Sequence, residues 1–292
     1  MRAIFPEILK RNSIWDGTHH DELERFLAYD PGVFLGGQLS ALGADTLFRR
    51  IGLPVLYTSS ETDKDWDDMC FSAARLETAL VGNPERGEAL IASYKQAFVD
   101  LEQELRPETF GVEPRVLMMA SSAPGQREFL GALRDGNLYD LYVYRAGLKN
   151  AASGWAGVQL VDVERILAMD PDMIFLTAGM PIDQGPKEFM IDPRWRGLKA
   201  VQEKRVYLMV GWLDGLDLQQ FWTRWMAELA HPDRLQPKFR EMLSDHFVKE
   251  FGYRLSDEQI DQFLHINENK DQSGYARFRR SQQADDGRSS SQ

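Results

Sequence analysis

The clearest pattern of apolar and polar positions is an amphipathic segment that ends at a proline and is followed by a short apolar run. In Glu164–Pro171, the proline disfavours helical geometry at Asp170, so a helix is predicted to end there. The next run, Met173–Leu176, is apolar at every position, which is typical of a strand covered on both faces in a parallel sheet. Glu24–Pro31 matches Glu164–Pro171 at six of eight positions and also precedes an apolar run. Because only two copies occur, the repeat predicts two related lobes and not a solenoid.

The remaining periodicity predicts alternating strands and helices on either side of one long helix. Apolar runs at 33–35 and 55–58 flank a helical segment at 42–51, which predicts a βαβ unit and a parallel sheet. From Pro84 to Leu105, apolar residues recur every three or four positions, which predicts a helix about 30 Å long. Further strands are predicted at 115–120, 141–144 and 205–210, and further helices at 129–134, 218–229, 238–251 and 257–266.

These elements predict an α/β fold of two lobes, each with a mainly parallel sheet flanked by helices, joined by one long helix. The predicted boundaries are an N-terminal lobe at 1–82, the linking helix at 83–112, a C-terminal lobe at 113–266 and a polar tail at 267–292. The tail is predicted to be disordered because it holds too few apolar residues to form a core.

Composition and charge exclude several classes of protein. The 292 residues carry a formal net charge of -11, which argues against non-specific binding to nucleic acid. The single cysteine, Cys70, excludes an internal disulfide and a metal cluster held by cysteines. No apolar run approaches the roughly 18 residues of a membrane span. Residues 1–7 lack the apolar core of a signal peptide.

Sequence motifs for catalysis, dinucleotide binding and phosphate binding are absent, so we predict neither an enzymatic activity nor a resident cofactor. His19 and His20 are interpreted as part of a solvated loop, because no spacing of other ligands completes a metal site. Glu228 is interpreted as a surface charge.

The predicted topology indicates where a ligand would bind. In a parallel α/β sheet, ligands occupy the crevice outside the carboxyl ends of the strands. The residues predicted there are small, aromatic or charged, a mixture that suits a ligand with apolar and polar parts. The candidate ligand-binding residues are Gly37, Gln38, Ser59, Ser60, Ser121, Ser122, Tyr144, Arg145, Trp155, Trp212 and Asp214. Each small residue, taken alone, is also explained by a tight turn.

Several segments together resemble the substrate-binding proteins of ABC importers for iron chelates, haem and cobalamin. These segments are the two copies of the repeat (Leu23–Leu35 and Val161–Asp172), Ile51–Val55, Trp195–Tyr207 and Phe221–Pro232. The resemblance implies a monomeric periplasmic binding protein whose two lobes are bridged by one long helix. It also implies a location in the periplasm, or outside the cytoplasm on a membrane anchor.

The resemblance further implies a partner and a role for two glutamates. In the family, one glutamate near the start of each matching helix docks onto arginines of the permease dimer in the inner membrane. The matching positions here are Glu24 and Glu164. The local alternative is that both glutamates only stabilise the starts of their helices.

The function implied by the resemblance is capture of an iron chelate, such as a ferric siderophore, or of a haem or corrinoid, between the lobes. Family members carry a signal peptide and an opening strand-helix-strand before the point where Met1 falls, so the N-terminal lobe is expected to be incomplete. One alternative is a degenerate or truncated member with an interaction-only role. A two-lobed enzyme of the nitrogenase-like kind would need cysteine ligands that one cysteine cannot supply.

Overall fold

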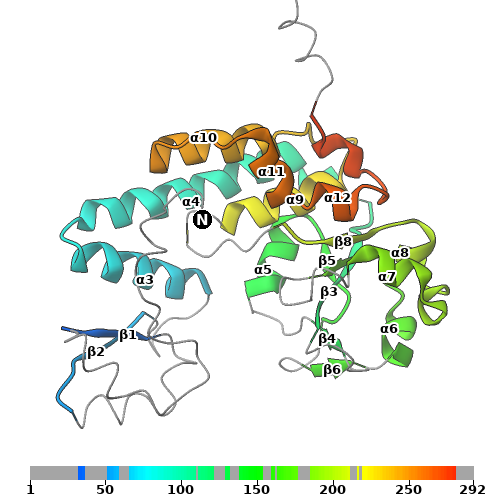
Figure 1. The fold of residues 1–292 in the computed structure, drawn as a ribbon, viewed down its shortest axis with the longest axis horizontal. Coiled ribbons are helices and arrows are strands. Elements are labelled where there is room, and N and C mark those ends of the chain that lie inside the picture. The colour runs from blue at the N-terminus through cyan, green and yellow to red at the C-terminus, as the bar shows by residue number, and fades with distance from the viewer. Residues whose placement is uncertain are drawn as a thin grey trace, which may run out of the picture. The chain divides into compact units, whose positions relative to one another are not determined.

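The computed structural model describes residues 32–36, 51–58, 66–109, 111–121, 129–131, 138–153, 159–161, 163–176, 185–210, 216 and 219–280 (Figure 1). The chain divides into two units, Met1–Ala89 and Leu90–Gln292. Each unit holds a sheet of its own.

The first unit contains a pair of parallel strands. β1 (Phe34–Gly36) pairs with β2 (Val55–Tyr57) in parallel, which confirms the predicted type of sheet. A parallel pair requires a crossover between its strands, as the βαβ pattern predicts. Apart from Ile51, the helix predicted at 42–51 lies outside the described residues, as does the first copy of the repeat helix.

Two helices follow in a tight hairpin. α3 (Trp66–Leu80) ends at a turn in which Gly82 has a φ of 77°, and α4 (Pro84–Leu105) begins two residues later. The two helices approach so closely that a Cβ at Gly87 would lie 2.4 Å from Thr78 Oγ1. The bounds of α4 confirm the long predicted helix, and the boundary between the units falls inside it.

The second unit is built on a six-stranded sheet with a parallel centre and an antiparallel edge. Its strands are β3 (Arg115–Ser121), β4 (Phe129–Gly131), β5 (Lys149–Asn150), β6 (Gln159–Val161), β7 (Met173–Leu176) and β8 (Val206–Leu208). The order is β6-β4-β3-β7-β8, and β5 pairs with the start of β3. β3, β7 and β8 run parallel, whereas β4 runs antiparallel to both β3 and β6.

The helices of the second unit alternate with these strands and then continue as a helical C-terminal region (Figure 1). The α-helices are α5 (Leu138–Arg145), α6 (Val163–Met169), α7 (Pro186–Ile191), α8 (Lys199–Gln202), α9 (Gln219–Ala230), α10 (Phe239–Phe251), α11 (Asp257–Phe263) and α12 (Ile266–Asn269). Three 3₁₀ helices are η2 (Pro107–Thr109), η4 (Pro193–Trp195) and η5 (Tyr275–Phe278).

β7 shows why its sequence is apolar at every position. All four of its side chains are buried, because the strand has a layer of helices on each face. Ile174 and Leu176 belong to a core shared with residues of α6, α7 and α8. Phe175 points the other way and contacts Trp225 of α9, with ring centres 5.0 Å apart. The sheet is therefore the middle of three layers in this unit.

Two short predictions in the second unit are wrong. Residues 141–144 belong to α5 and not to a strand, although tyrosine and valine favour strands. Residues 129–131 form β4 and not a helix, because this segment pairs with β3 on one side and β6 on the other. In both cases tertiary contacts outweigh the local preference, which is weak over so few residues.

The predicted tail also begins too early. Residues 267–280 are ordered, and they include most of α12 and all of η5. Tyr275 and Phe278 are fully buried against Trp225 and Phe239, so two rings fasten an otherwise polar segment. The prediction of disorder is wrong for 267–280, and residues 281–292 lie outside the described residues.

Candidate functional site

Three parallel strands of the second unit bring their carboxyl ends to one edge of the sheet. Leu176 of β7 is paired with Met119 of β3 and with Leu208 of β8. Ser121, one of the candidate residues, is the last residue of β3. The loops that follow these strands therefore begin at the same edge, where a parallel α/β sheet places its ligand site.

Most of the candidate ligand-binding residues lie outside the described residues. These are Gly37, Gln38, Ser59, Ser60, Ser122, Trp155, Trp212 and Asp214. Several of the strand ends before them are placed, however. In the first unit, Gly36 and Tyr57 are paired at the ends of β1 and β2. The topology expected for a strand-end site is therefore present within each unit.

Tyr144 and Arg145 do not end a strand, because both lie in the last turn of α5. Arg145 Nη1 donates a hydrogen bond to the Tyr94 hydroxyl (2.8 Å), and the guanidinium carbon lies 4.2 Å from the centre of the Phe98 ring. These contacts tie α5 to α4. The chain then enters β5, which pairs with the amino end of β3. The reasoning that placed the two residues at the carboxyl edge is therefore wrong.

Glu164 is exposed in the first turn of α6. The helix packs on the sheet through Ile166 and Met169, which are its buried residues. Within the part of the chain that the structure describes, the Glu164 side chain has no hydrogen-bond or ion-pair partner. The helix dipole favours a carboxylate at this position, and the carboxylate stays available to a partner. Glu24, the other docking candidate, lies outside the described residues.

Two aspartates around Pro171 fix α6 to the sheet. Asp170 accepts a hydrogen bond from Lys199 N (3.0 Å), and Asp172 accepts bonds from Arg115 N (2.7 Å) and Lys199 Nζ (2.5 Å). Burial raises the pKa of the Asp172 carboxyl, but the bonds from Lys199 and Arg115 outweigh it, so the pKa lies below its usual value. The Asp-Pro-Asp sequence therefore holds the helix that presents Glu164.

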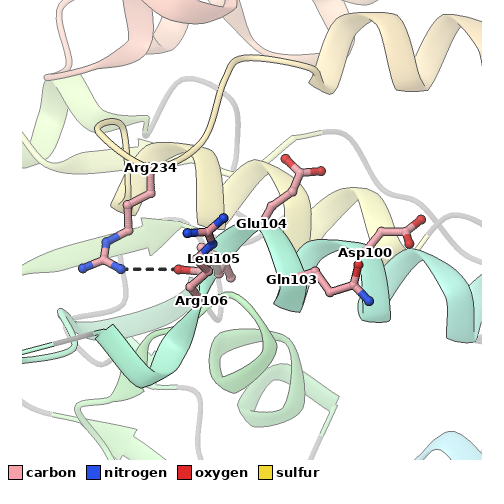
Figure 2. A pocket seen from close by; sticks show the side chains of 6 residues that line it. All are labelled: Asp100, Gln103, Glu104, Leu105, Arg106 and Arg234. Carbon is pink, nitrogen blue, oxygen red and sulfur yellow. Dashed lines mark hydrogen bonds between the residues drawn. The ribbon is translucent and has the colours of Figure 1, made fainter.

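Two cavities lie along the C-terminal half of α4. One has a volume of about 560 Å³ and is lined by Asp100, Gln103, Glu104, Leu105, Arg106 and Arg234 (Figure 2). Arg234 Nη1 donates to Leu105 O at 3.4 Å, at the carbonyl end of the helix. The other cavity measures about 480 Å³ and shares Asp100 and Glu104 with the first. Both cavities mix acidic and basic side chains, so neither presents charge of a single sign.

A buried charge network next to the second cavity was missed by sequence reasoning. Glu228 is fully buried, and its Oε1 accepts hydrogen bonds from Arg224 Nε (2.7 Å) and Lys238 N (2.9 Å). Arg224 also pairs with Glu104 of α4 (3.1 Å). Burial raises the pKa of Glu228, and the bond from Arg224 offsets part of that rise. The interpretation of Glu228 as a surface charge is wrong; its spacing of four residues from Arg224 was the available signal.

Two general searches add to this picture. Among the described residues, no three His, Cys, Asp or Glu side chains are grouped as ligands for a metal ion. None of the helices in the described ranges combines the length and apolar character needed to cross a membrane.

Comparison with known proteins places the chain in a family. A sequence profile described as periplasmic binding protein matches residues 22–210. A periplasmic solute binding protein from Veillonella parvula is similar with a TM-score of 0.72 and 21% identity, over 92% of this chain and 81% of that chain. The molybdate periplasmic binding protein MolA of Haemophilus influenzae has a TM-score of 0.73 and 19% identity, over 87% and 82%. No protein with a curated description matches the sequence.

A periplasmic heme binding protein from Pseudomonas aeruginosa is also similar, with a TM-score of 0.61 and 20% identity, over 73% of this chain and 76% of that chain. At these identities the structural likeness establishes the fold. The profile spans more than half of the chain, so the chain belongs to the periplasmic binding protein family. It is a solute-binding component of an ABC transporter, which confirms the predicted family and the α/β fold class.

Proposed function

We propose that the chain captures an iron chelate of the siderophore type, or a related metal-organic complex such as haem or a corrinoid, between its lobes. It then delivers this cargo to a permease dimer. The observation that most supports the proposal is the family match over residues 22–210, which includes both copies of the repeat from which two lobes are predicted.

The ligand class is argued from the residues that follow strand ends. Trp155 and Trp212 offer rings for stacking, while the glycines and serines leave room for a bulky ligand. Tyr144 and Arg145 are left out of the proposed site, because they occupy the end of α5 and Arg145 is bound to α4. The likeness to a heme binding protein supports a metal-organic ligand, and the likeness to a molybdate-binding protein makes molybdate the competitor to test.

Delivery is proposed to depend on Glu24 and Glu164, which would meet arginines of the two permease subunits. The exposed position of Glu164 at the start of α6 supports this role. A carboxylate pairs with arginine in a bidentate geometry that also fixes orientation. The alternative of a degenerate member with interactions only keeps the docking surface and loses the ligand.

The experiment is a titration of the intrinsic tryptophan fluorescence of the purified chain with a ferric siderophore, haem, cobalamin, molybdate and ferric ion alone. Saturable quenching by one of the three metal-organic complexes at micromolar or lower concentration is the expected result. Trp212→Phe should weaken that binding about tenfold or more, an effect typical of an aromatic residue central to a binding site. Tyr144→Phe is the control and should leave the affinity unchanged.

Saturation by molybdate alone would replace the proposed ligand class with an oxyanion. No response to any of the five from protein with a cooperative thermal transition would reject ligand capture and favour the interaction-only alternative. Equal loss of affinity in both variants would reject the proposed placement of the site.

A further inference from the structure

β8 is the last strand in the described order of the second sheet. Met209 N, just after the strand, donates to Leu176 O of β7 (2.9 Å). Because successive residues of a strand turn their backbone groups to opposite sides, Lys204, Val206 and Leu208 turn theirs away from β7. Backbone groups left in this state form an open edge, which is a template for pairing with another chain.

A side-chain amide covers the end of this edge. Leu208 N donates to Asn269 Oδ1 (2.8 Å), and Asn269 Nδ2 donates to Leu208 O (2.9 Å). Asn269 is fully buried, so neither end of its amide is shared with solvent. One primary amide thus makes the same donor and acceptor pair that a residue of a neighbouring strand would make.

The next two outward-facing positions are met by residues just beyond α12. Ser273 N donates to Lys204 O (2.7 Å). With its amide oriented so that both ends are satisfied, Gln272 donates to Val206 O (2.9 Å). The contacts therefore follow the two-residue period of the strand edge, one after another, and run antiparallel to β8 in sequence.

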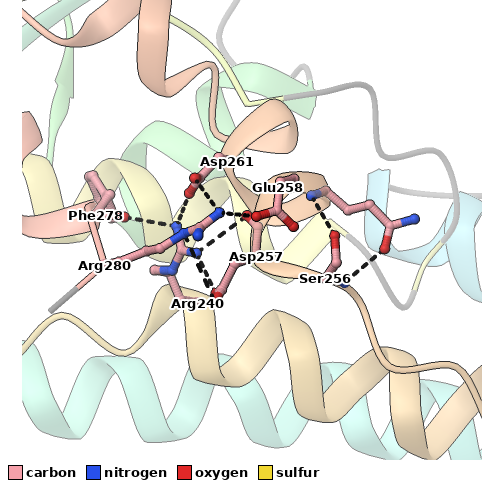
Figure 3. Close-up of polar contacts among 8 residues, drawn as sticks. Arg240, Ser256, Asp257, Glu258, Asp261, Phe278 and Arg280 are labelled. Carbon is pink, nitrogen blue, oxygen red and sulfur yellow. Dashed lines mark hydrogen bonds and ion pairs between the residues drawn. The ribbon is translucent and has the colours of Figure 1, made fainter. Parts of the chain in front are cut away.

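The segment that makes these contacts is firmly attached. We call residues 264–280 the C-terminal strap. Arg277 donates to the backbone oxygens of Glu228 and Leu235, and Tyr275 donates to Leu264 O. The last residue, Arg280, pairs with Glu258 of α11 (2.7 Å) (Figure 3). The strap is thus held at both ends of its passage along β8.

The same end of the strap adjoins a cluster of charges between α10 and α11. Figure 3 shows Arg240 and Arg280 among Asp257, Glu258 and Asp261. Arg240 Nη1 also donates to Phe278 O (3.1 Å), so the cluster reaches the strap backbone. Because these pairs are partly exposed, their contribution falls at high salt, whereas the Asn269 amide pair is buried and does not.

We propose that the C-terminal strap is an autoinhibitory cover of the β8 edge, and that the edge pairs with β8 of a second copy of the chain when the cover is lost. The occupant follows from the contacts. The edge offers alternating backbone donors and acceptors, and only another extended backbone satisfies all of them at once. A second copy presents the same edge, so the contact closes by two-fold symmetry.

The test compares Asn269→Ala with Asn267→Ala in the full chain. Both residues lie in α12, but Asn267 is exposed and Asn269 makes the amide pair. We expect Asn269→Ala to form a concentration-dependent dimer in light scattering after size exclusion, where the unchanged chain and Asn267→Ala keep their mass. Amide exchange at Leu208 should be at least 100-fold faster in the variant at concentrations too low for association.

Three outcomes overturn the proposal. The first is an unchanged mass for Asn269→Ala with a fast Leu208 amide, which means that the open edge does not pair. The second is an unchanged Leu208 exchange rate, which means that Asn269 is not the cover. The third uses Ile260→Ala, a buried α11 position away from the edge, to lower stability without opening β8. Equal association in that variant at an equal loss of thermal stability would mean that partial unfolding is the cause.

If Asn269→Ala does not fold, Gln272→Ala is the second variant. It removes one amide from the middle of the edge and leaves the Asn269 pair in place. Faster exchange of amides at the β8 edge, together with a measurable increase in dimer, supports the proposal. The absence of both overturns it.

Discussion

At the residue scale, the second unit depends on charged side chains that are buried and paired. Arg224 and Glu228 are both almost or fully inaccessible, and they join α9 to α4 and to the start of α10. A buried pair adds little over an apolar pair of the same shape, but breaking it leaves one charge without compensation. This asymmetry makes the pair testable.

Arg224→Met should lower the free energy of unfolding by about 3–5 kcal/mol, because Glu228 stays buried without its partner. Adding Glu228→Gln should lower it by less than the sum of the two single changes, since no buried charge then remains at the pair. Urea unfolding followed by circular dichroism gives all three values. Strict additivity would contradict the role of the pair.

A second residue-scale prediction concerns the contact between α3 and α4. Gly87→Ala gains helix propensity, but its Cβ would meet Thr78 Oγ1 at 2.4 Å and Ala74 O at 3.1 Å. We expect the overlap to outweigh the gain and to cost about 1–3 kcal/mol, which is the usual range for overpacking.

In a Thr78→Ala background, Gly87→Ala should cost less or become stabilising, because the nearest atom has been removed. Thermal unfolding of the four proteins of this cycle measures the coupling. The same effect of Gly87→Ala with and without Thr78 would show that the hydroxyl is not what requires glycine.

At the scale of elements, α6 is the helix on which the proposed docking depends. It is attached to the sheet by Asp170, Asp172 and the buried Ile166, and it leaves Glu164 exposed. Changes at Glu164 should therefore leave the fold and the ligand site intact.

Glu164→Arg, alone or with Glu24→Arg, is expected to abolish ligand-dependent stimulation of the permease ATPase, because like charges would then meet. Ligand affinity and thermal stability should not change. Glu203→Arg, at an exposed position after α8, is the matched control for a change of two charges. Normal stimulation by the Glu164 and Glu24 double variant would reject the docking role.

The elements also show how far pattern reasoning reaches. The long α4, the helix-proline-strand unit at α6 and β7, and the C-terminal helices were predicted because each has a long or strongly periodic pattern. α5 and β4 were not, because eight and three residues carry too little periodicity to outweigh tertiary contacts. Ser256 and Gln259 were a reliable signal, since the predicted cap forms a complete capping box at the start of α11.

At the scale of the whole molecule, stability should fall in mild acid. His231 Nε2 lies 3.0 Å from Ala146 O and 3.1 Å from Gly147 O, so this nitrogen carries the proton of a neutral ring. Burial lowers the pKa of His231, and the two carbonyls offset part of the effect. Burial likewise lowers the pKa of His265, against the influence of Glu268.

The unfolded chain therefore binds protons at these two histidines before the folded chain does. The stabilising difference is fully present above the unfolded pKa of about 6.5 and is lost as pH falls from there through the lower folded values. We expect the free energy of unfolding to decrease between pH 7.5 and 5.5. His231→Gln should be less stable at pH 7.5 and show a shallower decrease; an unchanged slope would exclude His231 as a source.

Local patterning in the sequence determined the fold class, the long helix, the parallel strands and the family, because each is encoded in residues close together in the chain. Only the tertiary structure decided which polar residues are buried. Glu228 and Asn269 look like ordinary surface residues in sequence, yet one is enclosed by Arg224 and Lys238 and the other completes the edge of β8. Their roles are set by partners 10 and 61 residues away, and no local pattern records contacts over such distances.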